Sequence, residues 1–405
     1  MQTTWTNWSG SVTCHPNTIE TPNSEEELQA LVKEACAAKQ TVRVVGTGHS
    51  FVPLCASDGL LLSLDNLQGV TDANQQDLWA VAWGGTKIYQ LGELLHKNDG
   101  MAMANMGDID RQSIAGAVST GTHGTGRTKG SISTQLRSIH LIQPNGEVRR
   151  IDQAEEPERF RAAQVSLGAL GVISQVGLNL LPTYRLHERT WGEPFEECMA
   201  HLDELVENNQ HFEFFWVPEH DICAIKTLNP TEETELLEPA ATPNVDGRLN
   251  KYIGKERIDY SHRIFPSERN NKFNEIEFAV AAKHGPDCLH EMRQLMQTKY
   301  ADVVWPIEYR TVAADDIYLS PAYGRATITL SLHQGAGLPY EAFFADVEAI
   351  FRNYNGRPHW GKMHSHTATE LRDLYPKWDA FLAVREEFDP DGCFLNDYLK
   401  RIFGL

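Results

Sequence analysis

The stretch Val44-Val45-Gly46-Thr47-Gly48-His49-Ser50-Phe51 places a histidine among small residues at the end of a β-branched run. A second such stretch, Gly116-Ala117-Val118-Ser119-Thr120-Gly121-Thr122-His123-Gly124-Thr125-Gly126, follows further along the chain. Because glycine has no side chain, the backbone of such segments can lie close to a ligand and donate several N–H groups to phosphate oxygens. One Gly-x-Gly-His loop alone would be a weak indication, but the pair predicts a nucleotide cofactor.

The familiar phosphate-binding loops do not explain these segments. Gly46-x-Gly48 lacks the third glycine of the Rossmann fingerprint, and the chain contains no Gly-x-x-x-x-Gly-Lys-Ser/Thr sequence. A different arrangement of backbone amides is therefore expected.

The bulk composition narrows the class of protein. With 405 residues the chain is long enough for two domains. Its 36 basic and 55 acidic residues give a formal net charge of −19, which would repel nucleic acids and anionic lipid surfaces. The sequence shows neither a signal peptide nor an apolar run of about 18 residues. We therefore expect a cytoplasmic monomer or small homo-oligomer without nucleic-acid or membrane partners.

The seven cysteines are odd in number and show no C-x-x-C spacing. This pattern is not typical of a disulfide framework or a zinc ribbon, so the sequence predicts free, buried thiols. The cysteines are Cys14, Cys36, Cys55, Cys198, Cys223, Cys288 and Cys393.

The amino-terminal region alternates between helical and strand-like segments, which predicts an α+β or α/β arrangement. Ser24-Glu25-Glu26-Glu27 has the form of a capping box, and apolar residues at helical spacing follow it. Thr41 to Val45 is typical of a buried strand, which places His49 in a loop at a strand end. We also expect strands at 60–64 and 78–82, a helix at 88–95, a hairpin of 136–142 with 147–151, and a strand within 167–181.

A second region begins after Pro182. Its expected elements are strands at 212–217, 275–281, 307–312 and 327–332, a helix at 340–353, and helical patterning within 371–403. The acidic stretch 231–250 is expected to be a surface loop. The predicted division is a first domain of residues 1–182, a second of 183–367, and a carboxyl-terminal segment of 368–405 that returns to the first.

Several motifs occur in the order found in one family of flavoproteins. They are Gly46-Thr47-Gly48-His49-Ser50, Asn105-Met106-Gly107-Asp108, Ser113 to Gly124, Glu308-Tyr309-Arg310 and His359-Trp360-Gly361-Lys362. With them the chain resembles, over essentially its whole length, the vanillyl-alcohol-oxidase-type (PCMH-type) flavoproteins, and most of all their alditol oxidase and aldonolactone oxidase branch. The resemblance implies an α+β fold in which an FAD-binding domain is joined to a substrate-binding cap domain with a mixed or antiparallel sheet.

The resemblance also implies how FAD is bound. The histidine at the position of His49 carries the flavin covalently through its 8α-methyl group, and a neutral imidazole is a competent nucleophile for such a bond. Gly107 corresponds to a small residue beside flavin C4a, which leaves room for O2 and so implies an oxidase that releases hydrogen peroxide. The implied cofactor-binding residues are Val45, Gly46, Thr47, Gly48, His49, Ser50, Gly107, Asp108, Ser113, Gly116, Thr120, Gly121, Thr122, His123, Gly126, Ile173 and His359.

The implied catalytic residues are Lys362, Glu308 and Arg310. Glu308 and Arg310 are two positions apart in a strand-like run, so their side chains share a face. We expect Lys362 and Glu308 to handle the hydroxyl proton and Arg310 to polarise the oxygen, while the carbon-bound hydrogen leaves as hydride to flavin N5. The substrate would be a small alcohol or lactone.

Four residues are expected to contact that substrate: Asp108, Arg127, Ser331 and His333. Alditol oxidases have a serine at the position of Asp108, a His-x-Thr at Ser331-Leu332-His333, and a small apolar residue at Arg127. These departures argue against a plain polyol and leave a nucleoside-like compound, an amino-bearing sugar, a free sugar or a sugar lactone as alternatives.

Other classes of protein stay open as alternatives. A flavin dehydrogenase that passes electrons to a quinone or cytochrome would share the same motifs, as would a non-catalytic flavin-binding homologue. His359, His364 and His366 have spacing that can bind zinc, but the sequence shows no paired carboxylate signature, so no metal is expected. A serine hydrolase is disfavoured because no Gly-x-Ser-x-Gly sequence occurs.

Overall fold

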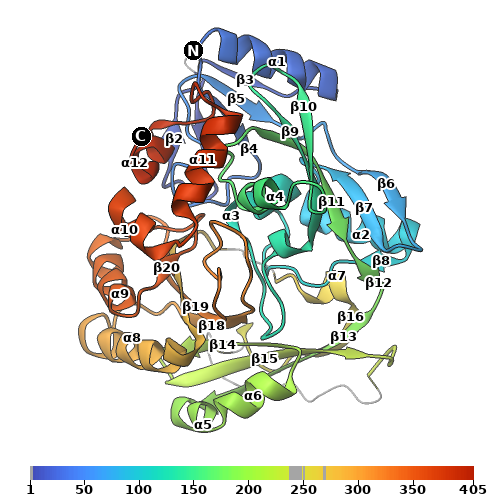
Figure 1. The fold of residues 1–405 in the computed structure, drawn as a ribbon. Coiled ribbons are helices and arrows are strands. Elements are labelled where there is room, and N and C mark those ends of the chain that lie inside the picture. Colours follow the sequence, from blue (N-terminus) through green and yellow to red (C-terminus); the bar gives the residue numbers. More distant parts are fainter. Residues whose placement is uncertain (1–2, 237–248, 250, 268–270) are drawn as a thin grey trace.

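The computed structural model describes residues 3–236, 249, 251–267 and 271–405. Most of the predicted surface loop at 231–250 lies outside these residues. Figure 1 shows an upper part built from the amino-terminal half together with the carboxyl-terminal helices, above a broad sheet formed by the middle of the chain. Both chain ends lie on the upper part. No helix in the described ranges has the length and apolar character needed to cross a membrane.

A small parallel sheet positions the first glycine-histidine segment. Its strands, in spatial order, are β3 (Thr18–Glu20), β5 (Leu60–Ser63) and β4 (Val42–Val45). Helix α1 (Glu25–Ala37) begins where the capping residue predicts, since the Ser24 hydroxyl accepts from the Glu27 N–H at 3.2 Å. The predicted helix and strands of this region are confirmed, and His49 follows β4.

A larger antiparallel sheet forms most of the remaining upper part. Its strands, in spatial order, are β10 (Val148–Asp152), β9 (Leu136–Ile142), β11 (Val172–Asn179), β7 (Trp79–Trp83) and β6 (Val70–Asn74). The predicted hairpin is confirmed, with Val148 opposite Ile142. Helices α2 (Ile88–Asp99) and α4 (Pro157–Gln164) and two short strand pairs complete this part, the pairs being β1 (Trp5–Thr6) with β2 (Thr13–Cys14) and β8 (Met101–Ala102) with β12 (Leu181–Pro182).

The second glycine-histidine segment is built differently from the first, which follows a strand. It begins with a helix, α3 (Ile114–Thr120), and His123 follows the left-handed residue Gly121 that ends it. Glycine and β-branched residues give this segment a poor intrinsic helix propensity. Burial of Ile114, Ala117 and Val118 in the main hydrophobic cluster outweighs that preference.

The lower sheet is antiparallel and has eight strands in the described part of the chain. In spatial order they are β16 (Glu256–Tyr260), β13 (Arg185–Pro194), β15 (Ile222–Thr231), β14 (His211–Val217), β18 (Ile307–Val312), β19 (Thr327–Gly335), β17 (Phe273–Ala281) and β20 (Arg357–Pro358). The strands predicted at 212–217, 275–281, 307–312 and 327–332 are confirmed. Strands β13 and β15 were not predicted, because the buried positions of β13 include the polar residues Glu188 and Thr190, and because β13 ends in a proline and β15 contains Pro230, a residue type that is uncommon in strands.

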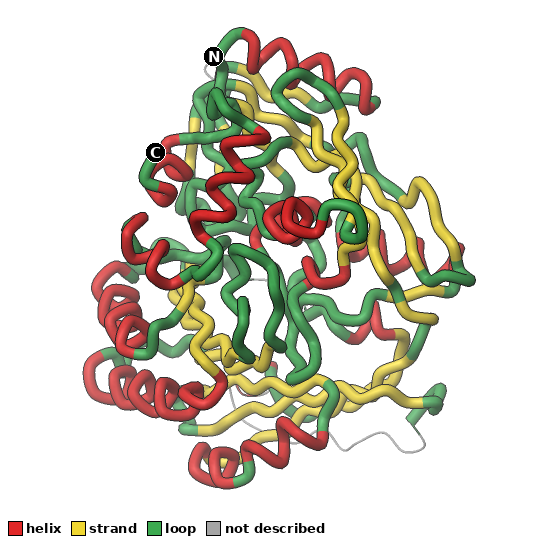
Figure 2. Tube along the Cα trace, in the orientation of Figure 1, coloured by secondary structure: helices red, strands yellow, loops and turns green. Residues whose placement is uncertain are grey.

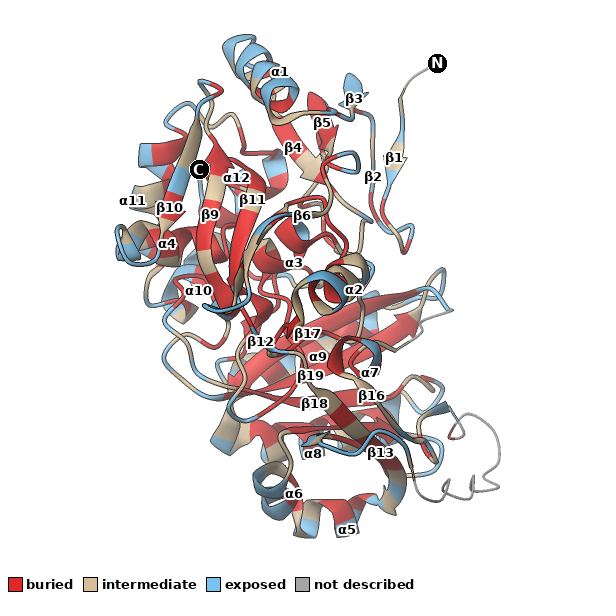
Figure 3. Cartoon of the chain, turned by 90° about the vertical axis from the view of Figure 1, so that its right-hand side faces the viewer, coloured by how far each residue is buried: buried red, intermediate tan, exposed pale blue. Residues whose placement is uncertain are grey.

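Helices cover one face of this sheet. They are α5 (Phe195–Ala200), α6 (Leu202–Asn208), α8 (Gly285–Lys299) and α9 (Glu341–Asn353), and they lie below and beside it in Figure 1. The strands send alternate residues such as Phe214, Tyr309 and Leu330 into the core against these helices. The residues between them point to the opposite face, toward the upper part, and Figure 3 shows the central strands as buried. Figure 2 shows that loops cross the space between the sheet and the upper part. The short helix α7 (Ser261–Ile264) lies near β16.

The carboxyl-terminal segment packs on the upper part. Helices α10 (Ala368–Leu374), α11 (Trp378–Phe388) and α12 (Asp397–Phe403) contribute Leu371, Phe381 and Phe403 to the same hydrophobic cluster as α2, α3 and α4. The helical patterning predicted within 371–403 is confirmed.

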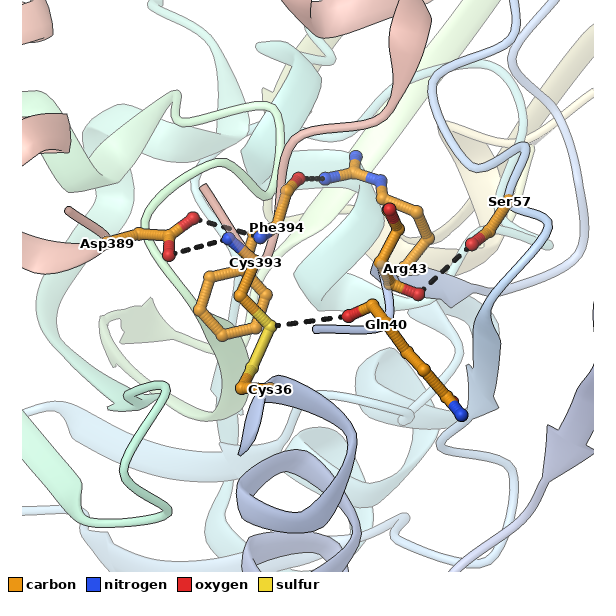
Figure 4. Close-up of a disulfide and its surroundings, with 8 residues drawn as sticks. Cys36, Gln40, Arg43, Ser57, Asp389, Cys393 and Phe394 are labelled. Carbon is orange, nitrogen blue, oxygen red and sulfur yellow. Dashed lines mark hydrogen bonds between the residues drawn. A yellow bond between two sulfur atoms is a disulfide. The ribbon is translucent and has the colours of Figure 1, made fainter. Parts of the chain in front are cut away.

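A disulfide ties this segment to the first helix. Cys36 and Cys393 are bonded, with a sequence separation of 357 residues and a Cα–Cα distance of 5.5 Å (Figure 4). The prediction of free thiols is wrong for these two cysteines, because the partners lie near opposite ends of the chain and only the fold brings them together. The Val42 N–H donates to the Cys393 carbonyl, and the Arg43 guanidinium donates to the Phe394 carbonyl. The segment 389–396 between α11 and α12, called the strap below, therefore also lies against β4.

Candidate active site

A glycine-lined cavity runs along the end of β4 and the start of α3. Its walls include ten of the residues predicted to bind the cofactor, namely Val45, Gly46, Thr47, Gly48, His49, Ser50, Ser113, Gly116, Thr120 and Ile173. Arg43 and Phe394 also line it, so the disulfide-linked strap forms part of the wall. The two sequence segments that carry the glycine-histidine pattern therefore meet at one cavity.

A second, charged cavity lies between this region and the lower sheet. It is lined by Gly107, Asp108, Thr122, His123, Phe273, Glu275, Glu277, Glu308, Arg310, His333, His359 and Lys362, among others. His49, Ser50, Gln112 and Thr120 line both cavities, so the cavities meet at His49. All three predicted catalytic residues lie in the charged cavity.

Some predicted residues lie elsewhere. Arg127 is exposed and is not among the residues that line either cavity. Gly126 donates its N–H to the Thr311 carbonyl at 2.9 Å and joins the loop to β18 instead. Gly121 lines a small neighbouring cavity, and Ser331 binds Glu277 behind the wall of the charged cavity.

His49 is held by the amino-terminal strand pair. The Trp8 N–H donates to the Gly48 carbonyl at 2.8 Å, and the rings of Trp8 and His49 lie 5.2 Å apart. Gly48 has a φ of +72°, and a Cβ there would lie 3.2 Å from Trp8 N, so a larger residue would be strained and crowded.

The His49 imidazole is neutral and has an unused nitrogen. Burial, with a smaller contribution from the charge of Lys362, lowers the pKa of His49 to about 4. Its Nδ1 atom is buried without a hydrogen-bond partner among the described residues. A buried polar atom without a partner is costly, so the site is completed by a group that bonds there. An FAD bound along the glycine-lined cavity with its ring at His49 fits this requirement.

Arg310 lies among carboxylates on the charged face of the sheet. Strand β18 places Glu308 and Arg310 on this face and Tyr309 on the opposite one. Arg310 Nη2 is 2.8 Å from Glu277 Oε2 and 3.4 Å from Glu308 Oε2. Burial opposes its charge, but these carboxylates raise the pKa of Arg310, so the guanidinium stays charged. Its Nε atom is buried and has no partner in the described part of the chain, which leaves a donor for a ligand oxygen.

Lys362 is paired with a residue that the sequence reasoning missed. Its ammonium group donates to Glu275, whose other oxygen is 3.7 Å from His333 Nε2. Glu275 and Glu277 occupy alternate positions of β17, in a run whose other residues are apolar except Asn274. Two glutamates at strand spacing within a buried strand are the signal that could have revealed them. Burial opposes their charge, but Lys362 lowers the pKa of Glu275, and Arg310 and His123 lower that of Glu277.

The charge of Asp108 is balanced by a buried lysine of the protein, Lys226. Lys226 of β15 lies 3.3 Å from Asp108 Oδ1 and 2.8 Å from Glu213 Oε1. Burial and the charge of Asp108 raise the pKa of Glu213. Lys226 and Glu213 were not predicted, because only the pairing of β14 with β15 and the approach of the loop at Asp108 bring them together.

Histidines and carboxylates in the charged cavity lie close enough to suggest a metal site. His123, Glu277 and His359 have ligand atoms within 4.8 Å of one another. However, both ring nitrogens of His123 already face hydrogen-bond acceptors, Gly124 O at 2.9 Å and Glu277 Oε1 at 2.7 Å. His359, His364 and His366 do not come together as a ligand set. Among the described residues, no group of three closely placed candidate ligands includes His364 or His366.

The fold and this site define a flavoprotein with a glycine-lined FAD cavity beside a charged pocket. A solved structure of cholesterol oxidase from B. sterolicum has the same fold, with a TM-score of 0.86 over 100% of this chain and 97% of that chain at 16% identity. The family model for an FAD binding domain matches residues 16–152.

Two further comparisons define the family. The model of D-arabinono-1,4-lactone oxidase matches residues 176–255 and 239–402. An L-gulono-1,4-lactone dehydrogenase of Mycobacterium tuberculosis is 37% identical over 100% of both chains. L-gulonolactone oxidase of Bos taurus is 28% identical over 98% of this chain and 97% of its own, and an alditol oxidase of Streptomyces is 29% identical over 99% of each. The chain belongs to the D-arabinono-1,4-lactone oxidase family, and the predicted FAD-dependent oxidoreductase of the aldonolactone oxidase branch is confirmed.

Proposed function

We propose that this protein oxidises an aldono-1,4-lactone at a hydroxyl-bearing carbon, with FAD as the bound oxidant. The observation that carries the proposal is the junction of the two cavities at His49, which brings the predicted cofactor wall against Lys362, Glu308 and Arg310. When bound, FAD supplies the hydride acceptor. The protein has to bind the lactone, orient its carbon–hydrogen bond and accept the hydroxyl proton.

Each of the three charged residues has a separate proposed role in the reaction. Arg310 keeps its charge and donates to an oxygen of the substrate, which polarises it. Glu308 lies beside Arg310 and is proposed to accept the hydroxyl proton. Lys362 approaches from the other side, bonded to Glu275, and is proposed to hold the same hydroxyl and take part in the proton transfer.

The pairing of charges within the pocket favours a lactone over an amino-bearing sugar or a nucleoside. An amino-bearing sugar or a nucleoside would be favoured if Asp108 and His333 were available to pair with polar groups of a ligand. Asp108 is met by Lys226 and His333 faces Glu275, so both have partners within the protein. A neutral lactone with hydroxyl groups fits such a pocket, and two of the relatives named above, together with the matching family model, carry lactones in their names. A free sugar or polyol is the next alternative.

We infer that O2 is the electron acceptor. Support comes from Gly107, since a Cβ there would lie 3.2 Å from both the His123 carbonyl and Thr122 Cγ2, so any larger side chain would fill this part of the pocket. A second candidate is a dehydrogenase with a dye, quinone or cytochrome as acceptor, which the name of the Mycobacterium tuberculosis relative favours. Comparing peroxide yield with dye reduction separates the two.

We also propose a covalent bond between the flavin 8α-methyl group and His49. Its support is the neutral, partnerless Nδ1 at the meeting point of the cavities. Acid precipitation tests it, because yellow colour should stay with the wild-type protein and move to the supernatant for His49→Ala.

The domain division is proposed as residues 1–182, 183–367 and 368–405. Two observations support this division. The carboxyl-terminal helices pack into the hydrophobic cluster of the upper part, and the strands of the lower sheet all lie within residues 185–358. The proposed active site then lies where the FAD-binding and substrate-binding domains meet.

Anaerobic mixing of the yellow protein with a panel of compounds tests the proposed function. Loss of the flavin absorbance with L-gulono-1,4-lactone or D-arabinono-1,4-lactone, and slower or no loss with xylitol and with nucleosides, is the expected result. If no lactone, sugar or polyol bleached the flavin, the proposed oxidation would be refuted.

A further inference from the structure

The glycine-lined cavity has few charged groups for a cofactor that is an anion. FAD carries a negatively charged diphosphate between its two halves. Backbone N–H groups can bind such a group, but they have no net charge. Among the described residues that line the cavity, the cationic side chains are those of Arg43 and Lys87, and the acidic one is that of Asp65. A full positive charge from this wall therefore comes from Arg43 or Lys87.

Arg43 is already used to hold the fold together. Its guanidinium donates to main-chain carbonyls at 2.7–2.9 Å, those of Leu54, Leu167, Gly168 and Phe394. These bonds take four of the five N–H groups of an arginine. Arg43 therefore joins the strap and two loops to β4, and Lys87 is the cation that has donors to offer to a ligand.

Lys87 lies directly before α2 and beside the first glycine segment. Its backbone forms a β-bridge with Ser113, and a Cβ on Gly46 would lie 2.6 Å from Ser113 Oγ. Lys87 Nζ lies 2.7 Å from Asp65 Oδ1, which is its one hydrogen-bond acceptor within the described part of the chain. Because an ammonium group has three N–H donors, two of them remain for a ligand in the cavity.

The two partners of this ion pair differ in their exposure to water. The Lys87 side chain is 10% exposed, whereas that of Asp65 is 56% exposed. Water hydrates the carboxylate of Asp65, so its attraction for the ammonium group is weak. Keeping the ammonium group of Lys87 covered by protein is unfavourable unless an anion compensates for its lost hydration. A diphosphate in the cavity would supply that compensation.

We propose that Lys87 binds the diphosphate of FAD and that Asp65 competes with the diphosphate for the same ammonium group. The inference concerns how FAD is bound, so it does not depend on the substrate or the electron acceptor of the proposed function.

The effect of neutralising Asp65 separates this role from a structural one. If Asp65 competes with the diphosphate, Asp65→Asn releases the ammonium group of Lys87 and removes a negative charge near the cofactor, so FAD binds more tightly. If the ion pair only holds the loop at Asp65 against the start of α2, both Asp65→Asn and Lys87→Met weaken FAD binding. The two roles therefore predict opposite signs for one substitution.

Equilibrium binding of FAD to the full chain tests the proposal. A His49→Ala background keeps the binding reversible, and quenching of flavin fluorescence gives the Kd at low and at high salt. At low salt we expect Lys87→Met to weaken FAD binding about 10- to 100-fold, because hydrogen bonds between charged groups are lost. We expect Asp65→Asn to strengthen it about 2- to 5-fold. High salt should reduce both effects.

Lys97→Met is the matched control for Lys87→Met. Lys97 lies in α2, pairs with Glu93 at 3.1 Å and lines neither the glycine-lined nor the charged cavity. It should therefore leave the affinity for FAD unchanged. Equal affinities of Lys87→Met and Lys97→Met, or weaker binding by Asp65→Asn, would overturn the proposal.

A second measurement retains His49 and reads the flavin absorbance per protein after expression with a limiting supply of riboflavin. We expect Lys87→Met to contain less FAD than Lys97→Met, and Asp65→Asn to contain at least as much as the wild type. Equal FAD content in Lys87→Met and Lys97→Met would overturn the proposal even if the His49→Ala protein bound no flavin. Failure of the wild type to oxidise any lactone would refute the proposed function and leave these binding results unaffected.

Discussion

The two walls of the proposed active site are built in different ways. The glycine-lined wall includes six glycines, among them Gly46 and Gly48 after β4 and Gly116 in α3, whereas the charged wall carries acidic and basic side chains, several of them from β17, β18 and β19. The first can approach a ligand closely at its glycines, which have no side chain. The second keeps charges buried because every one of them has a partner of opposite sign. The comparison indicates that binding the cofactor and moving the proton are separate tasks, carried by separate parts of the chain.

Of the substitutions considered, removing Lys362 from the charged wall should have the largest effect on the rate of flavin reduction. For Lys362→Met we expect flavin reduction to slow by about 10²- to 10⁴-fold, because a proton-handling group is lost, while the FAD content stays unchanged. Stopped-flow absorbance under nitrogen measures the rate. Lys299→Met is the control, since Lys299 is exposed on α8 and pairs with Asp346 far from either wall. A variant with normal reduction would refute the role of Lys362.

The disulfide supports the glycine-lined wall, since Phe394 of the strap lines the cavity and accepts a hydrogen bond from Arg43 of β4, which also lines it. We expect Cys36→Ser to lower the free energy of unfolding by about 2–4 kcal/mol, because the link that closes a long loop is lost. Urea unfolding with and without dithiothreitol checks this. The wild type should lose stability on reduction, and the variant should not respond. Cys14→Ser, at a free cysteine, should behave as the wild type. Identical unfolding curves for Cys36→Ser and the wild type would contradict the expectation.

Two buried histidines, His49 where the two walls meet and His359 in the charged wall, should make the protein less stable in acid. Burial lowers the pKa of His49 to about 4 and that of His359 to about 3, from an ordinary value of 6.5. Between these values the unfolded chain binds the proton and the folded protein does not, so stability falls as the pH falls from 6.5. Each such histidine contributes a slope of about 1.4 kcal/mol per pH unit.

Replacing one of these histidines tests the pH dependence. For His359→Asn, the decline in unfolding free energy from pH 6.5 to pH 4 should be shallower than for the wild type. Denaturant unfolding at several pH values measures it. Parallel curves would show that His359 is not held neutral.

A substitution in the glycine-lined wall should have the smallest effect on stability but a specific effect on the cofactor. For Gly48→Ala we expect a loss of about 1–2 kcal/mol from the left-handed backbone, together with less FAD bound, because the Cβ would press on Trp8 N. Gly324→Ala is the matched control, with a φ of +69° and no atom within 4 Å of its Cβ. It should lose similar stability and keep its FAD. Equal FAD content in both variants would contradict the proposed binding mode.

The difference between the walls also explains what the sequence could and could not reveal. A glycine-rich pattern lies within one short stretch of sequence, so the segment around His49 and its strand could be predicted. The order of the motifs along the chain then identified Lys362, Glu308 and Arg310 as further candidate residues. Glu275, Glu277 and Lys226 were missed because their importance depends on cross-strand register, such as Glu277 opposite Ser331. The same reason applies to Cys36 and Cys393, whose pairing requires contacts between the two ends of the chain.

Flavin reduction and FAD content, measured together on the wild type and on Lys362→Met, test the separation of the two walls most directly. We predict that L-gulono-1,4-lactone rapidly bleaches the wild-type flavin under nitrogen, and that Lys362→Met binds as much FAD but is bleached far more slowly. A wild-type protein that lacks flavin absorbance after reconstitution, or a Lys362→Met protein that loses its FAD together with its activity, would contradict it.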